Sequence, residues 1–339
     1  MSFIEYVEYF LAIYVAITLM LFVLSLGPLP KCGFYARLLA SYLSLIGCAT
    51  YGVVASIVLR LVGYGRVSQW ATARSFKWVM RYTTGVEFVV DRKENLQTRP
   101  AVFIGNHQTE LDVLMLGEIF PPYCSVTAKK SLKAIPFLGW FMALSGTVFI
   151  DRANRQTALA AFESAAAEIR REKQSVFIFP EGTRSYSTKP DLLPFKKGAF
   201  HLAVKAQVPI VPIVVANYSN VLNVKERKFT SGQIPVKVLD PIPTTNLTSE
   251  DVDDLTTRTR EIMLKELIQL NQTATSASPF AADAARHDLD ASKMATGASA
   301  PISVSPAVAS KASGIDRVAA NGHGHGHGHS IKANGNGAL

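Results

Sequence analysis

Residues 101–112 read AVFIGNHQTELD, an apolar run that ends at a histidine and a carboxylate. The β-branched and aromatic residues at 102–104 predict a short buried strand. His107 and Asp112 are five residues apart, a spacing that does not put two side chains on one face of a regular helix. The stretch therefore predicts a strand, then the histidine in a turn, then a helix that carries the aspartate in its first turns, with Thr109 as its cap.

The histidine and the carboxylate support two interpretations. A carboxylate that binds one imidazole nitrogen fixes the tautomer and leaves the other nitrogen to take a proton, as a general base must. A capped helix start with an incidental histidine would give the same sequence. Taken alone, this stretch favours neither interpretation.

The same apolar run recurs twice along the chain. Residues 147–152 read TVFIDR and residues 175–185 read SVFIFPEGTRS, so three Val-Phe-Ile runs each end in polar side chains. Ligands of parallel α/β sheets bind outside the carboxyl ends of the strands, and we therefore expect one pocket built from three loops. Arg152 and Arg184 carry the forked guanidinium group that holds a phosphate. For Arg152, a surface ion pair with Asp151 is an equally good alternative.

The loop PEGTR at 180–184 carries more chemistry than an ordinary turn. Pro180 sets a rigid turn, and Gly182 lets a ligand approach the backbone. Glu181 offers a carboxylate that accepts a hydrogen bond from a hydroxyl group. The alternative is a plain polar loop between a strand and a helix. The run VPIVPIVV at 208–215 has no reactive group and predicts a structural strand, which can also form an apolar wall for a hydrocarbon chain.

A domain over residues 65–271 is expected to have an α/β fold. Short β-rich runs alternate there with helix-like segments such as 157–172, which predicts a mostly parallel central sheet flanked by helices. His201 lies in one of the apolar helical segments and is expected to pack in the core. From 272 to 339 the composition shifts to Ala, Ser, Gly and Pro and includes a His-Gly repeat. That composition predicts a disordered tail without a catalytic role.

Residues 1–64 hold two long apolar stretches, 10–26 and 38–59. A helix needs roughly 17–25 apolar residues to cross a bilayer, so this segment is expected to be a membrane anchor of one or two helices. Basic residues follow from Arg60 onward, and such residues collect on the cytosolic side. Two crossings and a hairpin that dips into the bilayer both satisfy the pattern. The aromatic and basic residues of 70–85 fit either the membrane interface or a surface helix packed on the domain.

The charge and the cysteines limit the possible partners. The chain has a formal net charge of +9, which favours an anionic partner such as lipid headgroups or a phosphorylated substrate. Nucleic acid is the weakest candidate, because no groove-reading motif and no basic run interleaved with aromatic residues is present. The three cysteines lack the spacing of a disulfide framework or a zinc site.

Four ordered blocks resemble the glycerolipid acyltransferase family, most closely its lysophosphatidic acid acyltransferase members. The blocks are NHxxxxD at Asn106, His107 and Asp112, FIDR at 149–152, FPEGTRS at 179–185 and VPIVPI at 208–213. Each block is short, but four in the right order with similar spacing are specific. The resemblance covers about residues 70 to 245 and implies the glycerolphosphate acyltransferase type of α/β fold.

The resemblance implies an enzyme that moves a fatty acyl group from acyl-CoA to the sn-2 hydroxyl of lysophosphatidate, giving phosphatidate. His107 would be the general base and Asp112 would orient it. The residues implied to hold the glycerol phosphate are Arg152, Glu181, Gly182, Thr183 and Arg184. No cofactor and no metal is implied, and neither a G-x-S-x-G elbow nor a cysteine beside a base suggests a covalent intermediate.

The implied partners are lysophosphatidate, acyl-CoA and membrane lipids, with no nucleic acid. The implied location is the endoplasmic reticulum membrane, with the catalytic domain in the cytosol. A relative that uses glycerol 3-phosphate or another lysophospholipid as acceptor is the first alternative. A membrane-anchored lipid-binding protein without turnover is the second, and the intact His107/Asp112 pair argues against it.

Overall fold

The computed structural model describes residues 2–150 and 155–276. Its α-helices are α1 (Phe3–Ser25), α2 (Cys32–Leu61), α3 (Ser68–Thr84), α4 (Asp112–Ile119), α5 (Leu138–Leu144), α6 (Arg155–Glu172), α7 (Gly198–Ala206) and α8 (Val252–Ser276). Its strands are β1 (Val86–Asp91), β2 (Val102–Gly105), β3 (Cys124–Lys129), β4 (Val148–Ile150), β5 (Ser175–Ile178), β6 (Ile210–Val215), β7 (Leu222–Asn223), β8 (Lys228–Phe229) and β9 (Gly232–Val238).

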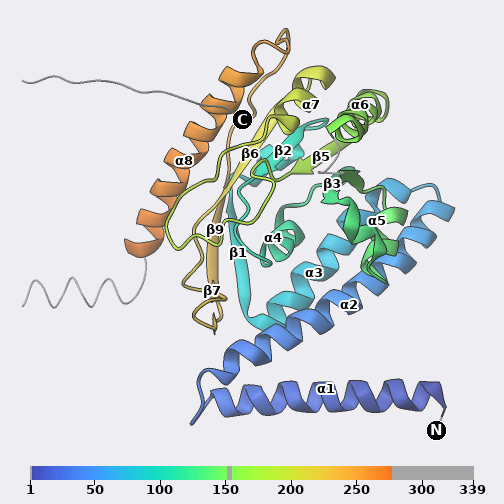
Figure 1. Cartoon of the computed structure of the whole chain (residues 1–339), viewed down its shortest axis with the longest axis vertical. Helices are drawn as coiled ribbons and strands as arrows, with labels where there is room; N and C mark the ends of the chain where they lie inside the picture. Colours follow the sequence, from blue (N-terminus) through green and yellow to red (C-terminus); the bar gives the residue numbers. More distant parts are fainter. Residues whose placement is uncertain (1, 151–154, 277–339) are drawn as a thin grey trace, which may run out of the picture. The chain divides into compact units, whose positions relative to one another are not determined.

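The strands form one central sheet and one small hairpin. The central sheet has seven strands in the order β1-β9-β6-β2-β5-β3-β4, and β7 pairs with β8. Neighbouring strands run parallel except β6 and β9, which are antiparallel. The prediction of a mostly parallel sheet flanked by helices is confirmed, and the three Val-Phe-Ile runs form its strands β2, β4 and β5 (Figure 1).

Strand β2 shows why a continuous apolar run suits the middle of this sheet. It lies between β5 and β6, and all four of its residues are buried. Phe103 joins the core beneath α2, α3 and α4, whereas Val102 and Ile104 join the core beneath α6, α7 and α8. Since successive side chains of a strand point to opposite faces, both faces need apolar residues. Each such burial contributes about 1.5–3 kcal/mol.

The arrangement brings three loops to one edge of the sheet. Strands β6, β2 and β5 are neighbours and parallel, so the segments that follow their carboxyl ends leave the sheet on the same side. The register pairs Ile104 with Ile178 in β5 and Gly105 with Ile213 in β6. The loops that begin at residues 106, 179 and 216 therefore lie side by side.

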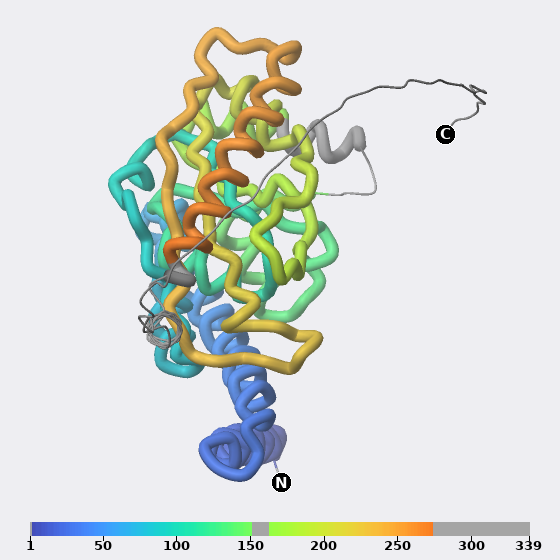
Figure 2. Tube along the Cα trace, turned by 90° about the vertical axis from the view of Figure 1, so that its left-hand side faces the viewer, coloured from blue at the N-terminus to red at the C-terminus, as the bar shows by residue number. Residues whose placement is uncertain are grey.

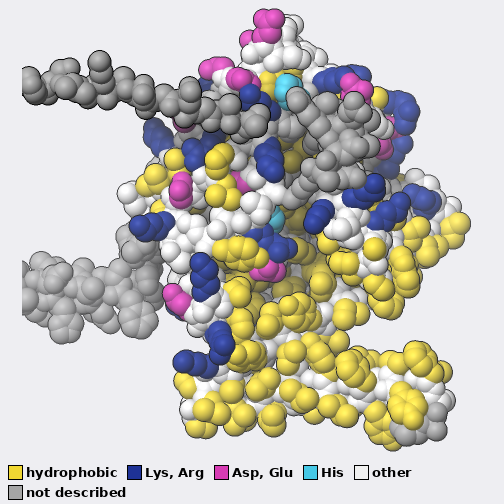
Figure 3. All heavy atoms as spheres, viewed as in Figure 1, with side chains coloured by type: hydrophobic (Ala, Val, Ile, Leu, Met, Phe, Trp, Pro, Cys, Tyr) yellow, Lys and Arg dark blue, Asp and Glu magenta, His cyan; other side chains and the backbone are white. Residues whose placement is uncertain are grey.

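Helices α1 and α2 differ from the rest of the molecule. Both are long and apolar enough to cross a membrane, with mean hydropathies of 2.3 and 1.9. Every residue of α1 is exposed or half-buried, and α1 lies at one end of the body, with α2 next to it (Figures 1 and 2). Hydrophobic side chains cover this end, whereas Lys and Arg side chains gather over the body (Figure 3).

Helix α2 also belongs to the body, because one of its faces packs on α3. Small residues allow the close approach: a Cβ added at Gly52 would lie 2.9 Å from the side chain of Thr72. Helix α3 in turn buries Phe76 and Met80 against the sheet core and exposes aromatic residues such as Trp78 on its outer face. Residues 70–85 therefore pack on the body as a surface helix, and the exposed aromatic face of this helix also fits the membrane interface.

Two smaller expectations are wrong. His201 is exposed on α7, although it was expected in the core. Thr109 is not the cap of α4, which begins at Asp112 after Leu111; the Thr109 hydroxyl instead accepts a hydrogen bond from Leu111 N, 3.1 Å away. The expected tail lies outside the described residues from 277 onward, and α8 continues to Ser276.

Candidate active site

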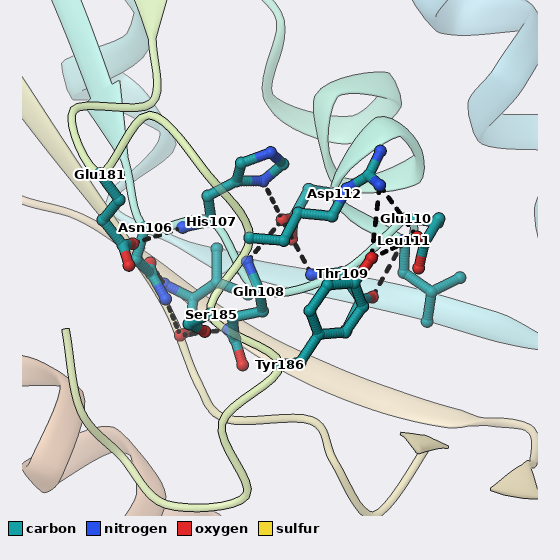
Figure 4. Close-up of polar contacts among 12 residues, drawn as sticks. Asn106, His107, Gln108, Thr109, Glu110, Leu111, Asp112, Glu181, Ser185 and Tyr186 are labelled. Carbon is teal, nitrogen blue, oxygen red and sulfur yellow. Dashed lines mark hydrogen bonds and ion pairs between the residues drawn. The ribbon is translucent and has the colours of Figure 1, made fainter. Parts of the chain in front are cut away.

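His107 and Asp112 are hydrogen-bonded at the carboxyl end of β2. The distance from His107 Nδ1 to Asp112 Oδ2 is 2.6 Å (Figure 4). His107 lies in the turn after β2, and Asp112 is the first residue of α4, where the helix dipole favours a negative charge. An ionised carboxylate only accepts hydrogen bonds, so the proton lies on Nδ1. This tautomer leaves Nε2, the other ring nitrogen, to accept a proton.

Asp112 is buried, with 1% of its surface exposed, and its carboxylate is well supplied with donors. Oδ2 also accepts from Gln108 N at 2.7 Å and from Thr109 N at 3.3 Å. Oδ1 accepts from the hydroxyl of Tyr218 at 2.7 Å. Burying a charge is costly unless hydrogen bonds compensate for the lost water, and these four bonds supply that compensation. The carboxylate therefore fixes both the imidazole and the turn that carries it.

The imidazole ring is fixed from a second side by Phe179, which follows β5. The two rings stack with centroids 4.1 Å apart and an angle of 19° between their planes. The two loops are also joined through their backbones, because Ser185 N donates to His107 O at 2.9 Å and Tyr186 N donates to Gln108 O at 3.1 Å. The loop after β5 thus holds the histidine in place.

Glu181 lies beneath this junction rather than on its surface. It is 3% exposed, and its carboxylate accepts hydrogen bonds from His107 N at 2.7 Å and from Leu193 N at 3.1 Å. Burial raises the pKa of Glu181 to about 6, against the opposing effect of these two backbone donors. The side chain therefore binds the backbone of the histidine.

Arg184 lies at the open side of the same loop, beside two polar partners. Its Nη1 donates to Glu110 at 2.9 Å and to the hydroxyl of Tyr186 at 3.3 Å, and Tyr186 donates to the same oxygen of Glu110 at 2.6 Å. Partial burial opposes the charge, but Tyr186 and Glu110 outweigh it and raise the pKa of Arg184. The guanidinium group is thus a fixed cation with further N–H donors for an anion.

A cavity of about 1180 Å³ opens beside these groups. At its polar end lie His107, Gly182, Thr183 and Arg184. Gly182 has φ +70, a conformation that glycine adopts without strain. The rest of the lining is largely apolar and comes mostly from α2, α3, α4 and α5, through residues such as Phe34, Leu38, Leu45, Phe76, Met80, Leu114 and Phe141. The cavity can hold a hydrocarbon chain with its polar end at the histidine.

The structure brings most of the predicted site residues together. His107, Gly182, Thr183 and Arg184 line one cavity, with Asp112 and Glu181 buried directly behind the imidazole and its backbone. Arg152 lies outside the described residues. No residue of β6 lines the cavity, so the apolar wall is formed by the helices and not by this strand.

Several contacts that shape the site could not be predicted from the motifs, although Asn106 itself belongs to one of them. Asn106 is buried and exchanges two hydrogen bonds with the backbone of Val215, at 2.8 and 3.0 Å. Gln108 donates to Val215 O and Ala216 O. Tyr218 binds Asp112 from the segment after β6. That segment also follows a strand that is parallel to β2. The rule that ligands bind outside the carboxyl ends of parallel strands would therefore have included it.

The described part of the chain holds no cluster of three or more His, Cys, Asp or Glu side chains arranged to bind a metal. The fold and the site define an α/β protein in which a carboxylate orients an imidazole at the mouth of an apolar cavity. An arginine lies beside the imidazole.

Comparisons with known proteins agree with this description. The acyltransferase family model matches residues 87–216. A 1-acyl-sn-glycerol-3-phosphate acyltransferase of Saccharomyces cerevisiae is 46% identical over 237 residues, which are 70% of this chain and 78% of the yeast protein. The human 1-acyl-sn-glycerol-3-phosphate acyltransferase beta is 40% identical over 242 residues, 71% of this chain and 85% of the human protein.

A solved structure shares the fold. The crystal structure of the 1-acyl-sn-glycerophosphate acyltransferase PlsC from Thermotoga maritima matches with a TM-score of 0.56 at 24% identity, over 71% of this chain and 94% of that one. The protein described here belongs to the acyltransferase family. It is an enzyme of acyl transfer.

Proposed function

We propose that the protein transfers a fatty acyl group from acyl-CoA to the sn-2 hydroxyl of 1-acyl-glycerol-3-phosphate and releases phosphatidate. The observation that carries the proposal is the 2.6 Å pair of His107 and Asp112 at the polar end of a large apolar cavity. The names of the relatives, which act on 1-acyl-sn-glycerol-3-phosphate, support the choice of acceptor.

The proposed mechanism is a direct transfer. His107 Nε2 removes the proton of the sn-2 hydroxyl as its oxygen attacks the thioester carbonyl carbon of acyl-CoA. The C–S bond then breaks, the CoA thiolate leaves, and the imidazolium returns the proton to that sulfur. Asp112 stabilises the imidazolium while it exists. The transfer needs no covalent acyl-enzyme, and no net proton is gained or lost.

Arg184, Thr183 and the backbone at Gly182 are proposed to hold the phosphate of the acceptor. All three line the cavity on the side of His107, which would place the glycerol hydroxyl near the imidazole. Arg152 is proposed as a second phosphate ligand on the strength of its motif alone. Glu181 acts indirectly in this proposal, because its carboxylate binds backbone N–H groups.

Holding two substrates in reactive geometry accounts for much of the acceleration in such a reaction. The cavity favours an acceptor that already carries one acyl chain, because its apolar lining has no counterpart in glycerol 3-phosphate. Helices α1 and α2 support a membrane location. We place the enzyme in the endoplasmic reticulum membrane with its catalytic domain in the cytosol, supplying phosphatidate for phospholipid and triacylglycerol synthesis.

An acyl-transfer assay with the purified, detergent-solubilised protein tests the proposal. One labelled acyl-CoA is offered with lysophosphatidate, glycerol 3-phosphate or lysolipids with neutral headgroups. Lysophosphatidate should be the preferred acceptor, and preference for another acceptor would overturn the assignment of the substrate.

A matched pair of histidine variants tests the base. His107→Ala should lower kcat by at least about 10³-fold, since proton transfer and its electrostatic support are both lost. His201→Ala removes an exposed histidine on α7 and should leave kcat unchanged. Full activity in His107→Ala would remove the general-base mechanism.

A further inference from the structure

Tyr218 is buried against the carboxylate of the dyad, in a segment that belongs to none of the four motifs. Its side chain is 1% exposed and packs edge-to-face on Phe88, with ring centroids 6.2 Å apart. Its hydroxyl oxygen lies 2.7 Å from Asp112 Oδ1 and accepts a hydrogen bond from Thr109 N at 3.1 Å. The phenol therefore reaches the one oxygen of Asp112 that His107 does not use.

The direction of this hydrogen bond follows from the chemistry of the two groups. The ionised Asp112 only accepts, so the hydroxyl of Tyr218 donates to it. Burial, and after it the charge of Asp112, raises the pKa of Tyr218 well above its ordinary value, so the phenol keeps its proton throughout the working range of pH. The chain of donors runs from Thr109 N through Tyr218 to the carboxylate, and each bond polarises the next.

We propose that Tyr218 is a positioning residue that sets the proton affinity of the His107–Asp112 pair through its hydrogen bond to Asp112 Oδ1. The inference rests on the proposed general-base role of His107. A donor on Oδ1 draws negative charge toward itself and away from Oδ2, the oxygen that faces the imidazole. It thereby limits how strongly the carboxylate stabilises the imidazolium, which must still release its proton to the leaving thiolate.

Other charged groups face the pair and must stay constant in a test. Glu181 binds the backbone N–H of His107 from the loop after β5, and Arg184 approaches from the open side and interacts electrostatically with Asp112. Replacement of Tyr218 by phenylalanine alters neither of these side chains and keeps the ring in its packed position.

Removal of the hydroxyl should shift the acid limb of the kcat–pH profile to higher pH. Without the donor, Oδ2 carries more charge and the imidazolium is held more tightly, so a higher pH is needed to free the base. For Tyr218→Phe we expect an upward shift of roughly half to one pH unit, a kcat lowered by roughly three- to tenfold at neutral pH, and an unchanged KM for lysophosphatidate.

A purely structural role predicts a different outcome. If the hydroxyl only ties the segment after β6 to α4, its loss lowers the melting temperature, and lowers kcat equally at every pH. Tyr14→Phe is the matched control, since it removes a phenol that donates to Leu39 O at 2.7 Å in the N-terminal helices. Its profile should keep the wild-type acid limb.

A second variant keeps the test decisive if Tyr218→Phe does not fold. Incorporation of 3-fluorotyrosine at position 218 keeps the side chain nearly unchanged in size but makes the phenol a stronger donor. The acid limb of its kcat–pH profile should shift to lower pH, by roughly a few tenths of a pH unit. Opposite shifts in the two proteins support the proposal, and an unmoved limb in the fluorinated protein overturns it.

The general-base role of His107 and the positioning role of Tyr218 can be refuted by different results. Wild-type turnover in His107→Ala refutes the general-base mechanism, whatever the Tyr218 variants do. Loss of turnover in His107→Ala together with an unmoved acid limb in Tyr218→Phe refutes only the role of Tyr218.

Discussion

Asp112→Asn separates the charge of the dyad from its shape. Asparagine has the same size, and its amide oxygen can replace Oδ2 as the acceptor for His107 Nδ1 and Gln108 N, which lie 2.6 and 2.7 Å from it. Its NH₂ group then faces Tyr218, whose hydroxyl can accept there and donate to Thr109 Oγ1, 3.0 Å away. The hydrogen bonds can thus persist while the negative charge is lost.

The size of the effect follows from the charge separation. For charge centres about 4 Å apart, as in a hydrogen-bonded imidazolium–carboxylate pair, attraction at an effective dielectric constant of about 20 is about 4 kcal/mol. The imidazole is cationic only after it has taken the proton, so this stabilisation acts on the transition state and not on the resting enzyme. A loss of about 4 kcal/mol corresponds to a roughly 10³-fold lower rate.

The assay is the initial rate of transfer to lysophosphatidate, measured as a function of both substrates. We expect kcat to fall by roughly 10³-fold, with KM for lysophosphatidate within about threefold of wild type. The matched control is Asp240→Asn, which removes an exposed carboxylate paired with Arg92 at 2.6 Å and should leave the rate unchanged. A kcat for Asp112→Asn within about threefold of wild type would falsify the electrostatic reasoning.

Three further predictions concern other parts of the chain. Arg184→Ala should raise KM for lysophosphatidate by roughly 10- to 100-fold and change kcat less, because a charge-assisted phosphate contact is worth about 1.5–3 kcal/mol; an unchanged KM would remove Arg184 from the phosphate site. The pKa of Glu181 rises from 4.5 to about 6 on folding, so between these pH values the folded protein binds more protons than the unfolded chain. The free energy of unfolding therefore falls by about 2 kcal/mol as the pH rises from 4.5 to about 6. Glu181→Gln should abolish that dependence, which melting temperatures at pH 4.5 and 7 will show, and a persistent slope would assign it to another group. A chain that ends at Ser276 should retain wild-type specific activity in the transfer assay, and a large loss would show that the C-terminal segment takes part.

The sheet was predictable because its strands carry a strong local signal. A strand buried on both faces needs an uninterrupted apolar run, and the runs at β2, β5 and β6 are of this kind. The positions of His107 and Arg184 followed from the same signal, since loops after parallel strands share one edge of the sheet.

The partners of individual contacts between distant segments carry no such signal, even where the rule for parallel strands locates the loop. Asn106 and Val215 pair across 109 residues, and Tyr218 reaches Asp112 across 106, so only the folded sheet brings these residues together. Helix α2 shows the same limit, because its composition is that of a membrane helix while a third of its most apolar window is buried in the body.

The error at His201 has a different cause. The residue lies between Phe200 and Leu202, which are both buried, and the apolar neighbourhood suggested a core position. Lys197 and Lys205 lie four residues before and after it and are exposed. Side chains four residues apart share one face of a helix, so the lysines predict the solvent-facing position that the structure shows.

Two carboxylates hold the turn that carries the proposed base, and their surroundings differ. Asp112 accepts from Gln108 N and Thr109 N at the start of a helix, where dipole and donors favour the charge. Glu181 accepts from His107 N in a buried position that raises its pKa to about 6. Below that pH the protonated Glu181 keeps less acceptor capacity for its two backbone donors. The two carboxylates therefore hold the same turn, but burial favours the neutral form only at Glu181.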